Sequence, residues 1–272
     1  MGRSTLEGLL SRDRLIVLLS LSSAVALSAA YILAGGGTGM SSLGMSMDTG
    51  PAGALIAGTP DMVSSVIWTP GYLIVIFVMW WLMMVAMMVP SASPVVLLYG
   101  ALHRDEGAGP ALEFFLGYLA VWAGFSAAAT LIQGALSAGG LVSAMYMNLA
   151  SIYLAAAVLI GAGLYQLSPL KAACLDFCRS PVEALTRHRR TGHAAAFRMG
   201  LVHGGYCLGC CWALMALLFV GGVMNIWWIV GIALYVAIEK LAPGGRRVAQ
   251  VMAIILISGG LVLLVGSLSA GA

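Results

Sequence analysis

The chain has 272 residues, of which 61% are hydrophobic and 8% are charged, and its formal net charge at pH 7 is +3. Soluble domains carry about 25% charged residues, so this composition excludes a water-soluble globular protein. Apolar runs of about 20 residues recur along the sequence, each long enough to cross about 30 Å of hydrocarbon as a helix. Because backbone polar groups in lipid must be hydrogen-bonded within their own segment, these runs are predicted to be helices.

In chain order, these runs predict an all-α, polytopic membrane helix bundle with about seven transmembrane helices in a single domain, residues 1–272. The predicted spans are approximately 15–34, 72–90, 111–134, 149–168, 201–222, 226–240 and 249–268. The first run is longer than the apolar core of a signal peptide, which has about 7–15 residues, so a retained helix is favoured over a cleaved one.

The distribution of Lys and Arg predicts the orientation of the bundle. Basic residues precede the first span and are concentrated in the loop 169–200, whereas the loops 35–71 and 135–148 contain no Lys or Arg. The N-terminus is therefore predicted to lie inside the cell and the C-terminus outside, in the plasma membrane of a bacterium. Because the basic residues lie where this topology requires them, the stretch 186–198 is not interpreted as a nucleic-acid site.

Three of the five cysteines lie in "HGGYCLGCCW", residues 203–212. The predicted topology places all five on the cytosolic side, where thiols stay reduced, so metal binding or redox chemistry is favoured over a structural disulfide. In a helix, His203, Cys207, Cys210 and Cys211 would share about 100° of one face. Thiolate and imidazole ligands suit Cu(I), Zn(II) or an iron–sulfur cluster.

The other two cysteines lie in "SPLKAACLDFCRSP", residues 168–181. Ser168 followed by Pro169 predicts the N-cap and first turn of a short helix. Cys174 and Cys178 are four residues apart, so this helix would present both on one side. The alternative for all five is that they pack as small buried hydrophobic residues.

Methionine is frequent, with 16 residues, and clustered. The segment "VMWWLMMVAMMVP", residues 78–90, contains two rows of methionines at four-residue steps: Met79, Met83 and Met87, and beside them Met84 and Met88. Thioethers are soft neutral ligands that favour Cu(I) over Zn(II), although methionines at helical spacing also fill gaps in a core. Further methionines are predicted in the outer loops, at Met40, Met45, Met47, Met145 and Met147.

Two features near these segments affect the predicted helices. Pro90 and Pro94 interrupt the apolar stretch 72–102, for which a kink or a short unwound segment is expected. Glu239 and Lys240 lie at the inner end of the sixth span, where an ionisable pair is a functional candidate. A structural role is favoured, because the long side chain of Lys240 is expected to extend to the membrane interface.

Several segments together resemble one bacterial family. They are "WWLMMVAMMVPSASPVVLLY" (80–99), "GYLAVWAGFSAAATLIQ" (117–133), "YQLSPLKAACLDFCRSP" (165–181), "HGGYCLGCCWALMALLFVGGVMNIWWI" (203–229) and "EKLAPGGRR" (239–247). The family is that of predicted metal-binding integral membrane proteins of unknown function, whose members are sometimes described as copper chaperones. The resemblance covers about 70–250 and implies metal binding in the membrane. It points to the cysteines, His203 and the methionines of 79–88.

The sequence therefore predicts a protein that handles copper as Cu(I), by transport or by delivery to a cuproenzyme, with zinc less favoured. Its partners would be the lipid bilayer and a soluble metal donor or an acceptor cuproenzyme. Common hydrolase and nucleotide-binding motifs are missing, so no enzymatic activity is predicted. Two alternatives stay open: a membrane thiol–disulfide oxidoreductase, and a structural subunit of a larger membrane complex. The oligomeric state does not follow from the sequence.

Overall fold

The computed structural model describes residues 3–37, 42–44, 46–47, 68–143, 147–180 and 193–270. Within these ranges there is no β-strand, only an isolated antiparallel bridge between Val142 and Leu149, so the predicted all-α fold is confirmed. The helices are α1 (Arg3–Leu33), α3 (Pro70–Leu102), the short 3₁₀ helix η2 (Arg104–Glu106), α4 (Gly109–Ala138), α5 (Ile152–Gln166), α6 (Pro169–Arg179), α8 (His193–Ala216), α9 (Leu218–Gly221), α10 (Ile226–Leu241) and α11 (Gly245–Ala270).

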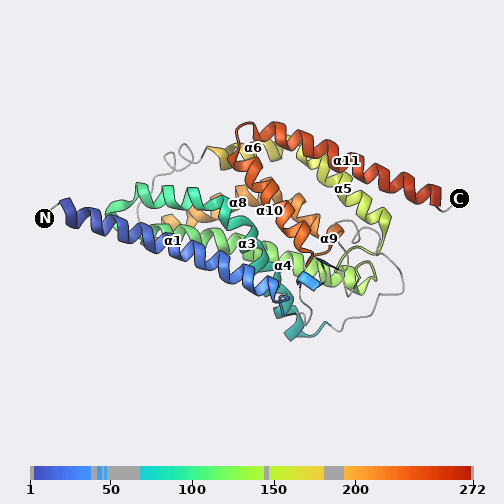
Figure 1. The fold of residues 1–272 in the computed structure, drawn as a ribbon, viewed down its shortest axis with the longest axis horizontal. Coiled ribbons are helices and arrows are strands. Elements are labelled where there is room, and N and C mark those ends of the chain that lie inside the picture. The colour runs from blue at the N-terminus through green and yellow to red at the C-terminus, as the bar shows by residue number, and fades with distance from the viewer. Residues whose placement is uncertain are drawn as a thin grey trace.

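The helices run back and forth along the long axis of the molecule (Figure 1). In that view α1, α4, α8 and α11 run in one direction, and α3, α5 with α6, and α10 run in the other, so the two termini lie at opposite ends. Within the described ranges, five helical segments are long and apolar enough to cross a membrane, and the pair α5 and α6, bent by 62°, would make a sixth. Since α10 has 16 residues, the predicted count of seven spans stays a prediction.

Polar residues that precede the helices fix where several of them begin. Ser151 accepts a hydrogen bond from the backbone of Leu154 at the start of α5, and Asn225 accepts one from Trp227 at the start of α10. Ser168 accepts one from the backbone nitrogen of Lys171, with Pro169 in the first turn of α6. The N-cap predicted from the sequence for this short helix is therefore confirmed.

The proline-containing helix α3 is longer than the span predicted for it. Pro90 and Pro94 both lie inside the continuous helix Pro70–Leu102, so the expected unwound segment is not found. Figure 1 shows that α3 instead changes direction along its length, which is the expected effect of proline inside a helix. At 33 residues it would measure about 50 Å if straight, so the bend shortens the thickness that it crosses.

The helices α4 and α8 approach each other at two glycines. A Cβ atom on Gly200 of α8 would collide with the backbone of α4 at Phe114, and one on Gly117 of α4 would collide with the backbone of α8 at Phe197. Small residues at a helix contact allow this close backbone approach, which is common between helices in membranes. The contact brings Tyr118 of α4 against the cysteine-containing part of α8.

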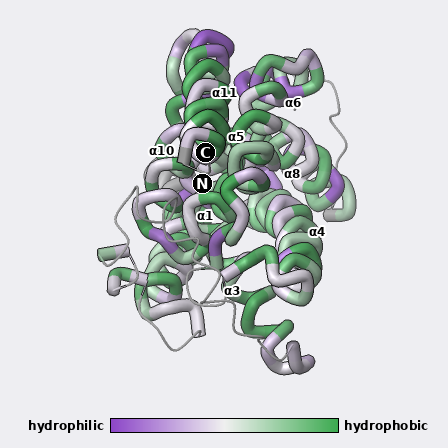
Figure 2. The backbone as a smooth tube through the Cα atoms, turned by 90° about the vertical axis from the view of Figure 1, so that its right-hand side faces the viewer, coloured by the Kyte–Doolittle hydropathy of each residue, from purple (hydrophilic) through white to green (hydrophobic). Residues whose placement is uncertain are grey.

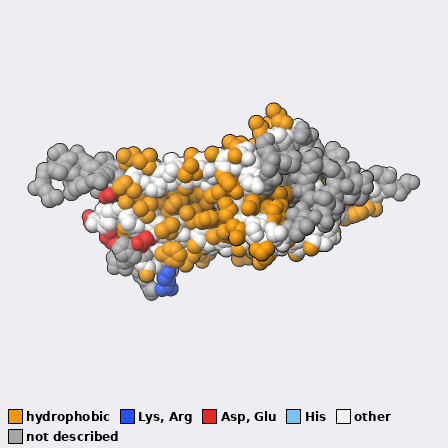
Figure 3. All heavy atoms as spheres, turned by 90° about the horizontal axis from the view of Figure 1, so that it is seen from below, with side chains coloured by type: hydrophobic (Ala, Val, Ile, Leu, Met, Phe, Trp, Pro, Cys, Tyr) orange, Lys and Arg blue, Asp and Glu red, His pale blue; other side chains and the backbone are white. Residues whose placement is uncertain are grey.

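The outside of the bundle is apolar along its length. Figure 2 shows that the helices consist mostly of hydrophobic residues, and Figure 3 shows hydrophobic side chains over the middle of one face, with charged side chains gathered toward the end where the chain begins. On α11, Ile254, Val262 and Val265 are among the exposed apolar side chains. This surface is compatible with a multi-pass membrane protein.

The described part of the predicted outer loop is more ordered than a Gly/Ser-rich segment suggests. Residues 42–44 and 46–47 are helical, and Ser46 accepts a hydrogen bond of 2.8 Å from the backbone nitrogen of Ile226. Met47 is exposed, whereas Met147 is buried. The predictions for Met40, Met45 and Met145 lie outside the described residues.

Candidate metal centre

The three clustered cysteines lie in the middle of α8, and their side chains are buried. Cys207, Cys210 and Cys211 are 1%, 1% and 0% exposed, and all five cysteines of the chain are free thiols. The Sγ atoms of Cys210 and Cys211 both donate to the carbonyl oxygen of Cys207, at 3.0 and 2.8 Å. The predicted helical placement of these residues is confirmed, and the shared acceptor keeps two thiols on the same side of the helix.

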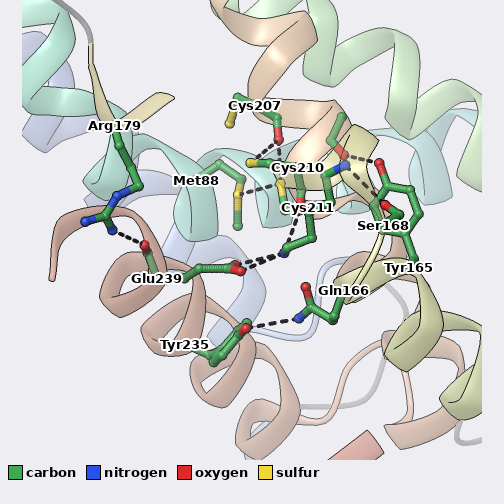
Figure 4. Close-up of polar contacts among 12 residues, drawn as sticks. Met88, Tyr165, Gln166, Ser168, Arg179, Cys207, Cys210, Cys211, Tyr235 and Glu239 are labelled. Carbon is green, nitrogen blue, oxygen red and sulfur yellow. Dashed lines mark hydrogen bonds and ion pairs between the residues drawn. The ribbon is translucent and has the colours of Figure 1, made fainter. Parts of the chain in front are cut away.

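The thiols of α8 meet the methionines of α3. The Sγ atom of Cys211 lies 3.9 Å from the Sδ atom of Met88, and the two sulfur atoms point toward each other in Figure 4. Thiol and thioether sulfurs are both soft ligands. This contact joins two segments that are 123 residues apart in the sequence.

The short helix α6 lies against the same part of α8. The thiol of Cys178 interacts with that of Cys210. Cys174 lies over Gly209, where a Cβ atom would be only 2.8 Å from its Sγ atom. The missing side chain at Gly209 therefore makes room for the thiol of Cys174, on α6, close to the cluster. Tyr165, at the end of α5, donates to the carbonyl oxygen of Gly209 and fixes this turn.

Two polar side chains contact the sulfur of Cys207. The Nζ atom of Lys240 donates to it at 3.0 Å, and the hydroxyl of Tyr118 lies 3.1 Å from it and 3.3 Å from the carbonyl oxygen of Met88. Lys240 is only 9% exposed. The expectation that this lysine extends to the membrane interface is therefore wrong, because the end of α10 turns its side chain toward α8.

A buried ion pair lies next to the cysteine cluster and contacts its backbone. The Nζ atom of Lys171 lies 2.8 and 3.0 Å from the two carboxylate oxygens of Glu239, and it also donates to the carbonyl oxygen of Cys210 at 2.9 Å. The guanidinium of Arg179 donates to the backbone carbonyl of Glu239 at 2.6 Å (Figure 4). These contacts tie the ends of α6, α8 and α10 together.

Sequence reasoning missed Lys171 and Tyr118, and it favoured a structural role for Glu239 and Lys240 over a functional one. The available signal was a carboxylate and an ammonium side by side at the end of an otherwise apolar run, "IWWIVGIALYVAIEKL". Ionisable residues inside membrane helices are usually paired and functional. Lys171 carried no such signal, because it lies in the basic segment that the topology alone explains.

His203 is buried one turn before Cys207, but its surroundings are aromatic. Its ring centroid lies 5.7 Å from that of Phe114 and 6.0 Å from that of Tyr118. A third aromatic ring, that of Phe177 on α6, lies 6.4 Å away. The predicted residue therefore lies at the edge of the cluster, packed among aromatic rings.

The methionines of α3 are all buried and extend away from the thiols. At the far end of the row, a Cβ atom on Gly36 would lie 2.9 Å from Cγ of Met79 and 3.1 Å from Cε of Met224, next to the end of α1. At the near end, Met88 contacts Cys211. The remaining members between them are buried: Met83, Met84 and Met87. Met224 and Met215, which the sequence did not single out, are fully buried as well.

A ready-made metal polyhedron of the usual ligands is not found. In the described ranges, no group of three or more His, Cys, Asp or Glu side chains is arranged to hold a metal ion. The sulfur atoms thus offer at most a pair of thiols in place, with a thioether beside them. Such a donor set fits a soft monovalent ion, which accepts few ligands, better than an ion that requires four.

Comparison with known proteins agrees with this chemistry. No curated protein and no solved structure matches the chain. The family model of PpoB2, whose description is "Copper chaperone", matches residues 77–263, a region that contains the methionine rows, α6 and the thiols of α8. The resemblance expected from the sequence is confirmed, and the chain belongs to the PpoB2 family of copper chaperones.

Proposed function

We propose that this protein spans a bacterial plasma membrane several times and handles copper as Cu(I). In this proposal the thiols of Cys207, Cys210 and Cys211, with Cys178 beside them, hold the ion on the cytosolic side, two at a time. The buried methionines of α3 form weaker stations along the bundle. The ion is passed to or from a soluble metal donor or an acceptor cuproenzyme.

The contact between Cys211 and Met88 carries this proposal. It connects a thiol to Met88, in one of the two adjacent rows of buried methionines on α3, and the other row begins at Met79, next to the end of α1. Neutral thioethers can line a path through a low-dielectric bundle without the cost of burying charge. Methionines that only filled the core would not require their row to end on a free thiol.

The alternative of thiol–disulfide exchange is less well supported. Exchange requires a thiolate to reach a sulfur atom of the partner, so at least one thiol must be accessible. The three thiols of α8 are at most 1% exposed, and Lys240 and Tyr118 lie against Cys207. Burial of this kind suits an ion better than a partner protein.

Metal analysis tests the proposed function. Protein purified in detergent, reduced and loaded anaerobically with Cu(I), should retain copper after desalting. The variant Cys207→Ser/Cys210→Ser/Cys211→Ser should lose it, because hydroxyl oxygen is a poor ligand for a soft ion. Met88→Leu should weaken Cu(I) affinity about tenfold, the low end of the range for groups that support a metal site.

The matched control is Met252→Leu, since Met252 is a partly buried methionine on α11, a helix that packs mainly against α5. It should bind copper as the wild type does. Equal copper content in the wild type and the triple serine variant would contradict the proposed function. Equal losses of Cu(I) affinity in Met88→Leu and Met252→Leu would contradict a role of the α3 methionines in copper binding.

A further inference from the structure

The buried charged side chains around the thiols do not cancel. Among the described residues of this region, Lys171, Glu239 and Lys240 are buried, so two ammonium groups face one carboxylate. Both oxygens of Glu239 are occupied by Lys171, at 2.8 and 3.0 Å. The remaining positive charge is that of Lys240, and its Nζ atom donates to the sulfur of Cys207.

A positive charge beside a cation site weakens binding, unless the bound ion and its ligands together carry a negative charge that the positive charge balances. One Cu(I) ion held by two thiolates carries a net charge of −1, and the ammonium of Lys240 brings the sum to zero. A divalent ion held by the same two thiolates is neutral, and the ammonium then leaves a net charge of +1 in a buried place. Uncompensated charge in a low-dielectric interior is costly.

A third thiolate would restore neutrality for a divalent ion, but the described side chains do not provide one in position. No group of three or more His, Cys, Asp or Glu side chains in these ranges is arranged to hold a metal. Cys174 lies over Gly209, and the thiol of Cys178 contacts that of Cys210 from the neighbouring helix α6. The geometry therefore favours two thiolates at a time, with Met88 as a neutral neighbour.

We infer that Lys240 acts as a charge filter, which makes the thiol cluster selective for monovalent soft ions, Cu(I) and Ag(I), over divalent ions such as Zn(II). The inference rests on the proposed function, because it concerns the same thiols. Lys240 does not bind the ion. It sets the charge that the bound ion and its ligands must balance, and its repulsion is about twice as large for a divalent ion.

The ratio of affinities for Ag(I) and Zn(II) tests the charge filter. Both ions are redox-inert and can be titrated into reduced, detergent-purified protein against competing chelators. In Lys240→Leu, the affinity for Zn(II) relative to Ag(I) should rise at least about tenfold. Removing the ammonium charge relieves more electrostatic repulsion for the divalent ion than for the monovalent ion. Lys240→Arg keeps the charge and should keep the ratio of the wild type.

Two further variants make the result interpretable. Lys240→Gln, which keeps a polar side chain of similar length, should behave as Lys240→Leu if the latter does not fold. Arg246→Leu removes an exposed cation from the same end of the bundle, where Arg246 pairs with Asp176, and should leave the ratio unchanged.

The outcomes separate the two proposals. A wild-type protein that binds both ions, with a ratio that changes less than threefold in Lys240→Leu and Lys240→Gln, contradicts the charge filter and leaves the proposed function intact. A wild-type protein that binds neither ion contradicts the proposed function and the filter with it. A ratio that changes equally in Arg246→Leu also contradicts the filter, because the effect would not be local to the thiols.

Discussion

The pair of Lys171 and Glu239 is the residue-scale feature on which the cysteine cluster depends. Both side chains are 1% exposed, and Lys171 also binds the carbonyl oxygen of Cys210. In Glu239→Gln the ammonium of Lys171 stays buried but no longer has a carboxylate to balance its charge. Breaking a buried ion pair in this way costs about 3–5 kcal/mol, so the free energy of unfolding in detergent should fall by that amount.

The exposed pair of Asp176 and Arg246 provides the matched comparison. Their side chains are 46% and 66% exposed, and solvent screens such a pair. Asp176→Asn should therefore leave the unfolding midpoint close to that of the wild type. Equal destabilisation of Glu239→Gln and Asp176→Asn would show that burial of the Lys171 pair is not what matters.

At this scale the sequence predicts the donors better than their surroundings. The positions of Cys207, Cys210 and Cys211 on one face follow from helical spacing alone, and the structure keeps them there. The neighbours of these thiols come from other helices: Tyr118 from α4 and Lys240 from α10. Spacing within one segment carries no information about such contacts, which depend on how the helices pack.

At the scale of elements, the crossing of α4 and α8 positions Tyr118 against the thiols. Gly200→Ala should be destabilising by about 1–3 kcal/mol, because its Cβ atom would collide with the backbone of α4 at Phe114. The displaced helix should also weaken Cu(I) binding. Both effects can be measured on one preparation, by thermal unfolding and by chelator competition.

Gly205→Ala is the control for this change, five residues further along the same helix. A Cβ atom on Gly205 meets nothing within 4 Å, and alanine favours a helix over glycine by about 1 kcal/mol. This variant should be as stable as the wild type or slightly more stable. If Gly200→Ala matched Gly205→Ala in stability and copper binding, the close crossing would have no role in holding the site.

The helices themselves show which element features the sequence can predict. The cap at Ser168 and the position of Cys174 and Cys178 on one side of α6 follow from local rules, and α6 is found where they predict it. The effect of Pro90 and Pro94 does not follow from such rules, because a proline can unwind a helix or only bend it. In α3 the helix continues through both prolines.

At the scale of the whole molecule, the predicted topology places the Lys and Arg residues on the cytosolic side. In Figure 1, α3 and α10 run opposite to α1, so the turns that follow them, at Gly107 and Gly244, face the side from which α1 starts. The turn at Gly140 follows α4, which runs with α1, and the turn at Gly222 precedes α10, so both face the opposite side. Reporters fused after Gly107 and Gly244 should be cytosolic, and those fused after Gly140 and Gly222 should be on the outer side.

The opposite assignment would place the thiols near the oxidising side and would remove the case for reduced ligands. Composition is sufficient to predict a helix bundle of this kind, since long uncharged runs have few other stable forms in lipid. It does not give the number of crossings, because the 16 residues of α10 and the bend between α5 and α6 fall short of a regular span.

The most direct test of the central claim is X-ray absorption at the copper edge of the reduced, Cu(I)-loaded protein. We predict that the nearest atoms to copper are sulfur only, in a two- or three-coordinate site. The sulfur signal should fall in Met88→Leu and disappear with the copper in Cys207→Ser/Cys210→Ser/Cys211→Ser. A nearest shell of nitrogen or oxygen, or a sulfur shell that survives the triple substitution, would contradict a copper site built on the thiols of α8.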